Sequence, residues 1–335
     1  MKSLSITKFL IKHLNLLDAL KIVFNFFLNL VLIFLEILFI TLVYLFISPE
    51  NDVSNKSFLI EHLINYINNF SISYSLTLIQ AKVILITISV ISKNVVLILQ
   101  NWFLSDFIFK LLEKKNAEVF ENYLKKDYLD FIKKDISYYT KNLNKEVYHV
   151  FSGVLQSLVQ IFNDTIYVIL ILVFSLELLN LHYSFYHLGI LFILIIFISF
   201  IFKKTKEIGK IRFNEETNVF KNVNNFFSSI KEVKIYGAYD ALISNFKDNI
   251  KKYYQTFIYG SVFSVAPKLI LEVFVLLAFY ISFSYSTESI ENFIPSIAVI
   301  VVLVLRILPP IHRSIANYSS IIFYKSSVKE TDMSY

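Results

Sequence analysis

The sequence predicts an all-α protein that crosses a membrane several times. Of its 335 residues, 56% are hydrophobic and only 17% are charged, and the mean hydropathy is +0.60. A soluble domain of this length needs more polar surface than that composition supplies. Five glycines and five prolines leave little material for the tight turns of a β-sheet protein. We therefore expect a polytopic membrane protein built from long helices.

Six segments are long and apolar enough to be transmembrane helices. A bilayer core about 30 Å thick requires about 20 apolar residues in a helix, and the segments that satisfy this are 22–47, 80–104, 153–176, 186–203, 257–283 and 293–311. The first is too long for the hydrophobic part of a signal peptide, and no small-residue cleavage site follows it. We expect it to be retained as a span.

The distribution of Lys and Arg predicts the orientation of these spans. Basic residues are concentrated before the first span and in segments 105–152 and 204–256, whereas the three other loops contain only Lys56. Because cytoplasmic loops carry the excess of positive charge, both termini should be cytoplasmic and the chain should lie in the plasma or inner membrane. We divide it into a cytosolic amphipathic segment 1–21 and a six-helix transmembrane domain 22–325.

The two basic inner segments, 105–152 and 204–256, are predicted to continue as helices beyond the bilayer. From Phe120 to Val147 apolar residues recur with the period of an amphipathic helix. Charged residues between them are consistent with a solvated face. Extensions of this length cost ordering entropy and bury little surface alone, so we expect a partner to contact them.

The stretch "SSIKEVKIYGAYDALISNF", which starts at Ser228, contains Glu232, Lys234 and Gly237. It resembles the segment that follows the second coupling helix of type I ABC exporters. Four other stretches resemble the branch of that superfamily that flips lipid-linked oligosaccharides: "FLEILFITLVYLFISPE", "YLKKDYLDFI", "APKLILEVF" and "LRILPPIHRSIANYSSIIF". The resemblance covers nearly the whole chain and depends on the order and spacing of the pieces.

This resemblance implies an ABC transporter type 1 transmembrane domain that pairs with a second copy and with ATPase domains. Two coupling helices would sit in grooves of those domains, the first near 127–138 and the second near 219–229. The anchors expected there are Asp127, Tyr128, Phe131, Phe226 and Phe227. Aromatic rings suit such a joint because they bury a large area with few rotors. The alternative is that these rings only pack helix on helix.

Three residues after the second coupling helix are assigned to the helix that returns to the membrane. These are Glu232, Lys234 and Gly237, and the glycine would permit a close approach or a bend.

The chain departs from the family in having no nucleotide-binding motif. It contains no G-x-x-x-x-G-K-[ST] loop to cradle phosphates, and residues 326–335 correspond to the start of the linker to an ATPase domain. We therefore expect this chain not to be an enzyme and to bind no cofactor, with ATP and Mg²⁺ held by a partner. Either a separate polypeptide supplies the ATPase or the gene is truncated.

Ionisable residues at membrane depth are costly and usually face a bundle interior or a wet cavity. The candidates are Glu36, Lys93, Asp164, Lys268, Glu272 and Arg306. Lys268 and Glu272 are four residues apart, so they can form a structural pair on one helix face. Unless Glu36 or Asp164 neutralises them, Lys93 and Arg306 would offer positive charge to an anionic head group such as a lipid pyrophosphate. Arg306 can instead lie near the cytosolic interface.

Three prolines are candidate kinks that would let a bundle open on alternate sides, or else fixed bends: Pro267, Pro309 and Pro310.

The leading hypothesis is a transmembrane subunit of an ATP-driven exporter or flippase that moves a lipid-linked glycan or a similar amphipathic anion. The alternatives are a truncated remnant or membrane scaffold, a peptide, drug or lipid exporter subunit, and a channel or secondary transporter. The sequence shows no catalytic or metal-binding constellation, and it has no cysteine for thiolate chemistry. We expect no nucleic-acid partner, because the inner loops account for the net charge of +6.

Overall fold

The structure is a computed structural model that describes residues 14–47, 58–179, 185–237, 239–284 and 290–332. Within these ranges every regular element is a helix and there is no β-strand. The all-α prediction is therefore confirmed. The first thirteen residues of the predicted segment 1–21 lie outside the described ranges, and residues 16–21 already belong to the first helix, which starts six residues before the predicted span.

Each of the six predicted spans falls inside a helical region of the chain. The long helices are α2 (Leu16–Ile47), α4 (Leu78–Leu124), α7 (Gln156–Leu179), α8 (Phe185–Ser228), α10 (Tyr239–Ser284) and α11 (Ile290–Phe323). Helix α4 starts with a capping box, in which Thr77 accepts from the Gln80 backbone and the Gln80 side chain accepts from Thr77.

By length and composition, three helical runs among the described residues could cross a membrane. They are Leu16–Ile47, Leu78–Leu124 and Ile136–Phe174. The chain therefore has the character of a membrane protein, while the full six-span topology and the orientation of the termini stay predictions.

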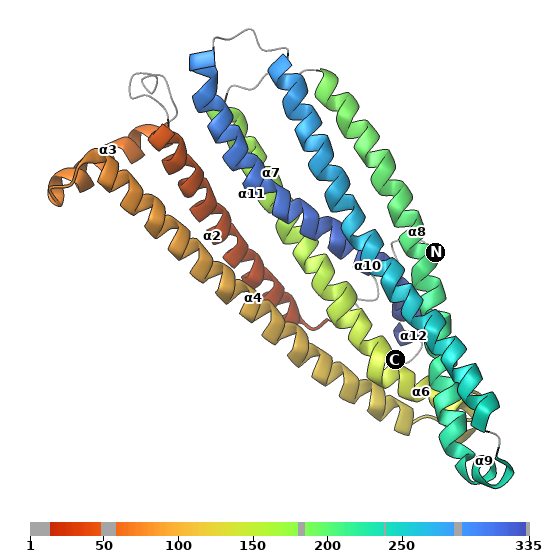
Figure 1. Ribbon diagram of the computed structural model, residues 1–335. Coiled ribbons are helices and arrows are strands. Elements are labelled where there is room, and N and C mark those ends of the chain that lie inside the picture. The colour runs from red at the N-terminus through yellow and green to blue at the C-terminus, as the bar shows by residue number, and fades with distance from the viewer. Residues whose placement is uncertain (1–13, 48–57, 180–184, 238, 285–289, 333–335) are drawn as a thin grey trace.

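The long helices lie side by side as three antiparallel pairs (Figure 1). Helix α2 pairs with α4, α7 with α11, and α8 with α10. The pair α2/α4 diverges from the others at the end that carries α3 (Phe58–Ser73), a helix that the sequence analysis does not predict. At the opposite end the helices converge, and α9 (Ile230–Tyr236) lies at the tip.

Two buried apolar clusters hold the bundle together. One joins α2, α3, α4, α7 and α11 and includes the buried Ile40 and Ile171. The other joins the inner part of α4 to the chain between α6 and α7 and is centred on Ile108 and Phe151. Within the predicted spans, van der Waals packing rather than removal from water holds these side chains together, because lipid is as apolar as they are.

The inner segment between α4 and α7 is not the continuous amphipathic helix that the periodicity predicts. It consists of α5 (Tyr128–Phe131), α6 (Ile136–Lys141) and two π-helical stretches, η2 (Asn142–Glu146) and η3 (His149–Leu155). The prediction is wrong because apolar periodicity does not reveal where a helix folds back. The Phe131 ring stacks on the Tyr139 ring at 4.3 Å, and the Tyr139 hydroxyl donates to the Phe131 carbonyl at 2.9 Å.

The second short inner helix begins later in the chain than predicted. Helix α8 continues through 219–228, and α9 follows at Ile230–Tyr236. Gly237 ends α9 with a left-handed φ of 64°, the backbone conformation that a glycine C-cap supplies. Glu232 and Lys234 therefore belong to α9 and not to the returning helix α10, which starts at Tyr239.

The predicted linker 326–335 begins as the short helix α12 (Lys325–Asp332). Its side chains Ser327, Val328 and Thr331 are buried against the rest of the chain. Residues 333–335 lie outside the described ranges.

Candidate functional site

The structure brings together three of the charges predicted at membrane depth. Glu36 on α2 lies between Lys93 on α4 and Arg306 on α11, with nitrogen–oxygen distances of 3.0 and 3.1 Å. The Arg306 guanidinium also lies over the Phe39 ring, 4.2 Å from its centroid, a favourable cation–π arrangement. The Glu36 carboxylate thus forms ion pairs with two cations from two other helices.

Asp164 forms a second ion pair, with a partner that the sequence analysis missed. Arg313 on α11 donates from Nη2 to Asp164 on α7 at 2.7 Å. Arg313 follows Arg306 by seven residues, which is close to two helical turns and places both on one face. That spacing was the signal available in the sequence.

These ion pairs line a cavity of about 200 Å³ between α2, α4, α7 and α11. Amide side chains occupy much of the rest of its wall, and none of them was predicted: Asn29, Gln100, Asn101, Gln160 and Asn163. Asn29 Nδ2 donates to the Asn163 carbonyl at 3.0 Å, and Asn163 Nδ2 donates to Asn25 Oδ1 at 2.7 Å. The wall therefore offers hydrogen-bonding groups alongside charges.

The cavity presents more positive than negative charge. Among the described residues that line it, three cations (Lys93, Arg306, Arg313) face two carboxylates (Glu36, Asp164), a net charge of +1. The cation side chains are 13%, 27% and 54% exposed, whereas the carboxylates are 1% and 8% exposed. The carboxylates are thus more deeply buried than the cations that pair with them. Such a site suits an anionic ligand, because Arg and Lys are the usual phosphate-binding side chains.

The predicted kink residues have different positions relative to this cavity. Pro309 and Pro310 line it, one turn from Arg306. Pro267 is buried within α10 and is not among the lining residues. The helices α10 and α11 continue through all three prolines.

The predicted pair of Lys268 with Glu272 is not placed. Glu272 is half-buried on α10, and the Lys268 side chain lies outside what the structure describes.

The predicted coupling residues lie at the converged end of the bundle, where α5 connects α4 to α6 and α9 connects α8 to α10 (Figure 1). Asp127 immediately precedes α5, and the Tyr128 side chain is 76% exposed. Phe131 instead packs inward on Tyr139. Only Tyr128 of the first pair of rings is therefore available to a partner.

The second predicted pair of rings lies in the last turn of α8. Phe226 and Phe227 contact each other with centroids 5.3 Å apart, and Phe227 is the exposed member. The structure adds two exposed side chains on α9 that were not predicted, Ile235 and Tyr236, the latter 81% exposed. We name Tyr128, Phe227, Ile235 and Tyr236 the tip patch.

We name the inner segment 105–152 the first arm and the inner segment 204–256 the second arm. Polar contacts hold the tip of the second arm against the first arm. Lys221 on α8 pairs with Asp135 at 3.5 Å, and Asn224 Nδ2 donates to Thr140 Oγ1 at 3.2 Å. A nearby exposed pair, Asp130 with Lys133, lowers the pKa of the Asp130 carboxyl through its hydrogen bond and charge.

A scan of the chain against protein-family models returned no match.

Proposed function

We propose that this chain is the transmembrane subunit of an ATP-driven exporter or flippase. The observation that carries the proposal is the form of the two inner arms. Helices α4, α8 and α10 extend well beyond their predicted spans, and the arms end in the short helices α5 and α9 at one end of the bundle (Figure 1). Exposed aromatic residues at such a tip are typical of a surface that anchors a partner.

In this proposal an ATPase subunit binds the tip patch and moves the arms. The ATP and Mg²⁺ would be bound and hydrolysed in that partner, since this chain has no phosphate-binding loop. A second copy of the chain would complete a twelve-helix bundle. Motion of the arms would then open the cavity to one side of the membrane and afterwards to the other.

The cavity supports an amphipathic anion as the substrate. Its cations would contact a phosphate or pyrophosphate head group, and its amides would hydrogen-bond to hydroxyl groups of an attached sugar. A lipid-linked glycan combines both features, so we propose it as the substrate class. The same scaffold in a peptide, drug or other lipid exporter is the second candidate, and a non-transporting scaffold is the third.

The first experiment tests the partner. The chain is co-expressed with stand-alone ABC ATPase subunits and captured through an affinity tag, in parallel with the double variant Tyr128→Ala/Tyr236→Ala. We expect the wild type to retain an ATPase subunit and the double variant to lose it. Tyr254→Ala is the matched control, because Tyr254 is an exposed tyrosine on α10 and should leave capture unchanged.

The second experiment tests transport. The captured complex is reconstituted in vesicles with a fluorescent polyprenyl-pyrophosphate glycan, and ATP-dependent loss of accessible label is followed. Arg306→Gln should abolish this signal without affecting capture of the ATPase. Capture of no ATPase by the wild type would favour the scaffold, whereas capture without movement of this lipid would favour another exporter substrate.

A further inference from the structure

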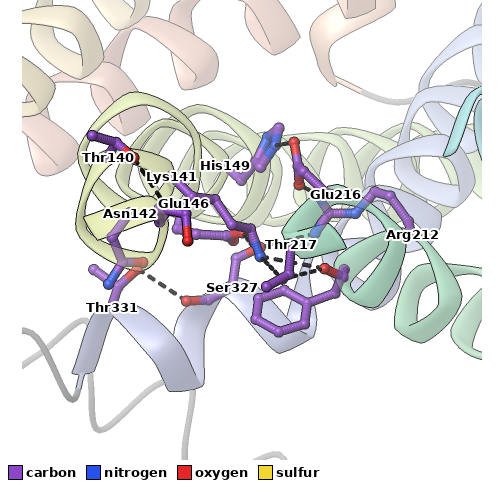
Figure 2. Close-up of polar contacts among 12 residues, drawn as sticks. Thr140, Lys141, Asn142, Glu146, His149, Arg212, Glu216, Thr217, Ser327 and Thr331 are labelled. Atoms are coloured by element: carbon purple, nitrogen blue, oxygen red, sulfur yellow. Dashed lines mark hydrogen bonds and ion pairs between the residues drawn. The ribbon is translucent and has the colours of Figure 1, made fainter. Parts of the chain in front are cut away.

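A second group of ionic side chains joins the two arms (Figure 2), and none of these residues lines the cavity between α2, α4, α7 and α11. It consists of Lys141, Glu146, His149, Arg212 and Glu216, which we name the arm network. All five residues are less than 10% exposed, and Arg212 and Glu146 are fully buried. They are supplied by α6, η2, η3 and α8, so the two inner segments of the sequence meet here.

Lys141 connects the first arm to the second. Its ammonium pairs with Glu146 at 2.9 Å and donates to the Thr217 hydroxyl on α8 at 2.7 Å. It also donates to the Phe213 carbonyl at 3.3 Å and lies over the Phe213 ring at 3.5 Å. The charge of Lys141 is therefore shared between a carboxylate of its own arm and the backbone of the opposite arm.

Glu216 joins three elements at one carboxylate. Arg212 Nη1 donates to its Oε2 at 2.6 Å. The Tyr253 hydroxyl on α10 donates to its Oε1 at 2.9 Å, and His149 Nε2 on η3 is 3.8 Å from the same oxygen. The returning helix α10 is thus tied to the first arm through α8.

The short helix α12 also contacts the network, through Arg212. Arg212 Nη2 donates to the Ser327 hydroxyl at 3.1 Å, and the Thr331 hydroxyl donates to the Ser327 carbonyl at 2.9 Å. The Tyr324 ring, immediately before α12, stacks on His149 at 4.3 Å. Arg212 therefore contacts α12 and Glu216 at once (Figure 2).

Stability alone does not explain why this buried site contains charged rather than apolar side chains. Well-packed apolar side chains of similar volume often stabilise a core as well as a buried ion pair does, whereas paired charges specify one arrangement of their helices. The residues Glu146 and His149 also come from π-helical turns, a geometry frequently found at functional sites.

We propose that the arm network is a latch that fixes α12 against both inner arms, so that α12, α6 and α8 move as one body. Release of Arg212 from Ser327 and Glu216 would free α12 while leaving the cavity between α2, α4, α7 and α11 intact. The latch involves only this chain, so it stands or falls independently of the proposed ATPase partner.

The test measures the exposure of α12 in the purified full chain. The sequence has no cysteine, so a single Val328→Cys reports on α12, where Val328 is buried. The rate at which a maleimide labels this α12 thiol is compared in detergent with and without Arg212→Met. We expect labelling to accelerate at least about tenfold in Arg212→Met, since that change removes the hydrogen bonds of the guanidinium to Glu216 and Ser327.

Two comparisons separate release of α12 from general unfolding. Ile171→Cys, fully buried in α7 far from the network, should remain protected in every variant. Glu207→Gln breaks the exposed Lys204–Glu207 pair on the same helix α8 and should leave labelling of the α12 thiol unchanged.

The milder variant Ser327→Ala decides the outcome if Arg212→Met exposes both thiols. It removes only the hydroxyl that α12 offers to Arg212, and it should accelerate labelling of the α12 thiol about fivefold, the effect of one hydrogen bond. Unchanged labelling of that thiol in Ser327→Ala, or acceleration by Glu207→Gln of the same size, would overturn the latch.

Discussion

The cavity between α2, α4, α7 and α11 and the arm network are built from the same kinds of ion pairs but differ in their access to solvent. In the cavity, the cations are between 13% and 54% exposed, and they outnumber the carboxylates that pair with them. In the arm network, two cations (Lys141, Arg212) and two carboxylates (Glu146, Glu216) balance, and all four are buried.

This difference separates a binding surface from a structural joint. A charge that reaches a cavity can exchange its protein partner for a ligand, because water and ligand compete for it there. A charge sealed among helices has no other partner, and breaking its pair leaves an uncompensated buried charge. Removing one charge should therefore change ligand binding in the cavity, whereas in the arm network it should lower the stability of the fold.

The largest expected effect is on stability, from Arg212→Met. This change leaves Glu216 buried without its guanidinium and should destabilise the chain by about 3–5 kcal/mol. Thermal unfolding in detergent measures the loss. Arg306→Met is the matched control, since Glu36 keeps Lys93 at 3.0 Å and the loss should be smaller.

The double variant Arg212→Met/Glu216→Leu checks the cause. Removing both charges should restore most of the lost stability, because the unpaired carboxylate is gone. A double variant no more stable than Arg212→Met would show that the destabilisation comes from lost packing instead.

The next effect concerns the close packing of α8 against α11 beside the arm network. Gly209 on α8, one turn before Arg212, lies against α11 so closely that a Cβ would be 2.5 Å from the Phe323 carbonyl oxygen. Gly209→Ala should therefore cost about 1–3 kcal/mol through overpacking. In the Val328→Cys background it should also accelerate labelling of the α12 thiol, because α8 and α11 must separate there.

Gly237→Ala provides the contrast at the tip. A Cβ at Gly237 has no atom within 4 Å, and only the φ of 64° opposes it, at a cost of about 1–2 kcal/mol. It should leave the α12 thiol protected. Equal acceleration by the two variants would mean that the close approach at Gly209 does not seal the network.

In the cavity, Glu36→Gln should strengthen the binding of an anion. The change frees Lys93 and Arg306 from their shared carboxylate, so inorganic pyrophosphate should bind about tenfold more tightly, equivalent to ~1.4 kcal/mol. The single tryptophan, Trp102, follows the lining residue Asn101 on α4, and its fluorescence can report the titration. Added salt should weaken binding.

Asp106→Asn is the control for that titration. It removes a carboxylate of an exposed pair with Lys110 on the same helix α4, and Asp106 does not line the cavity. Weaker binding in Glu36→Gln than in wild type would contradict the view that Glu36 competes with the ligand.

The smallest effect is a pH dependence of stability from Glu216. Burial opposes its ionisation, but His149, Arg212 and Tyr253 together favour the carboxylate and lower the pKa of Glu216 below its ordinary value of 4.5. Its contribution to stability is therefore present above pH 4.5 and is lost as the pH falls through the lower folded-state pKa.

Unfolding of wild type and of Arg212→Met/Glu216→Leu across the acid range isolates this contribution. The stability of the double variant should fall less steeply below about pH 4.5. Parallel curves would mean that Glu216 is not ionised in the folded chain.

Much of this molecule could be predicted from local sequence. Apolar runs and the scarcity of Gly and Pro led to long helices, and the structure has a helix at every predicted span. The cost of burying charge singled out Glu36, Lys93, Asp164 and Arg306, all of which line one cavity.

The sequence by itself determined which segments are helical and which charges need partners, because both follow from the preferences of neighbouring residues and from the cost of burying charge. Only the tertiary structure decided which residues pair with these charges. Arg313 reaches Asp164 across 149 positions, and Arg212 reaches Ser327 across 115. Such pairs depend on which helices pack together, and the apolar periodicity of a single segment does not specify its neighbours.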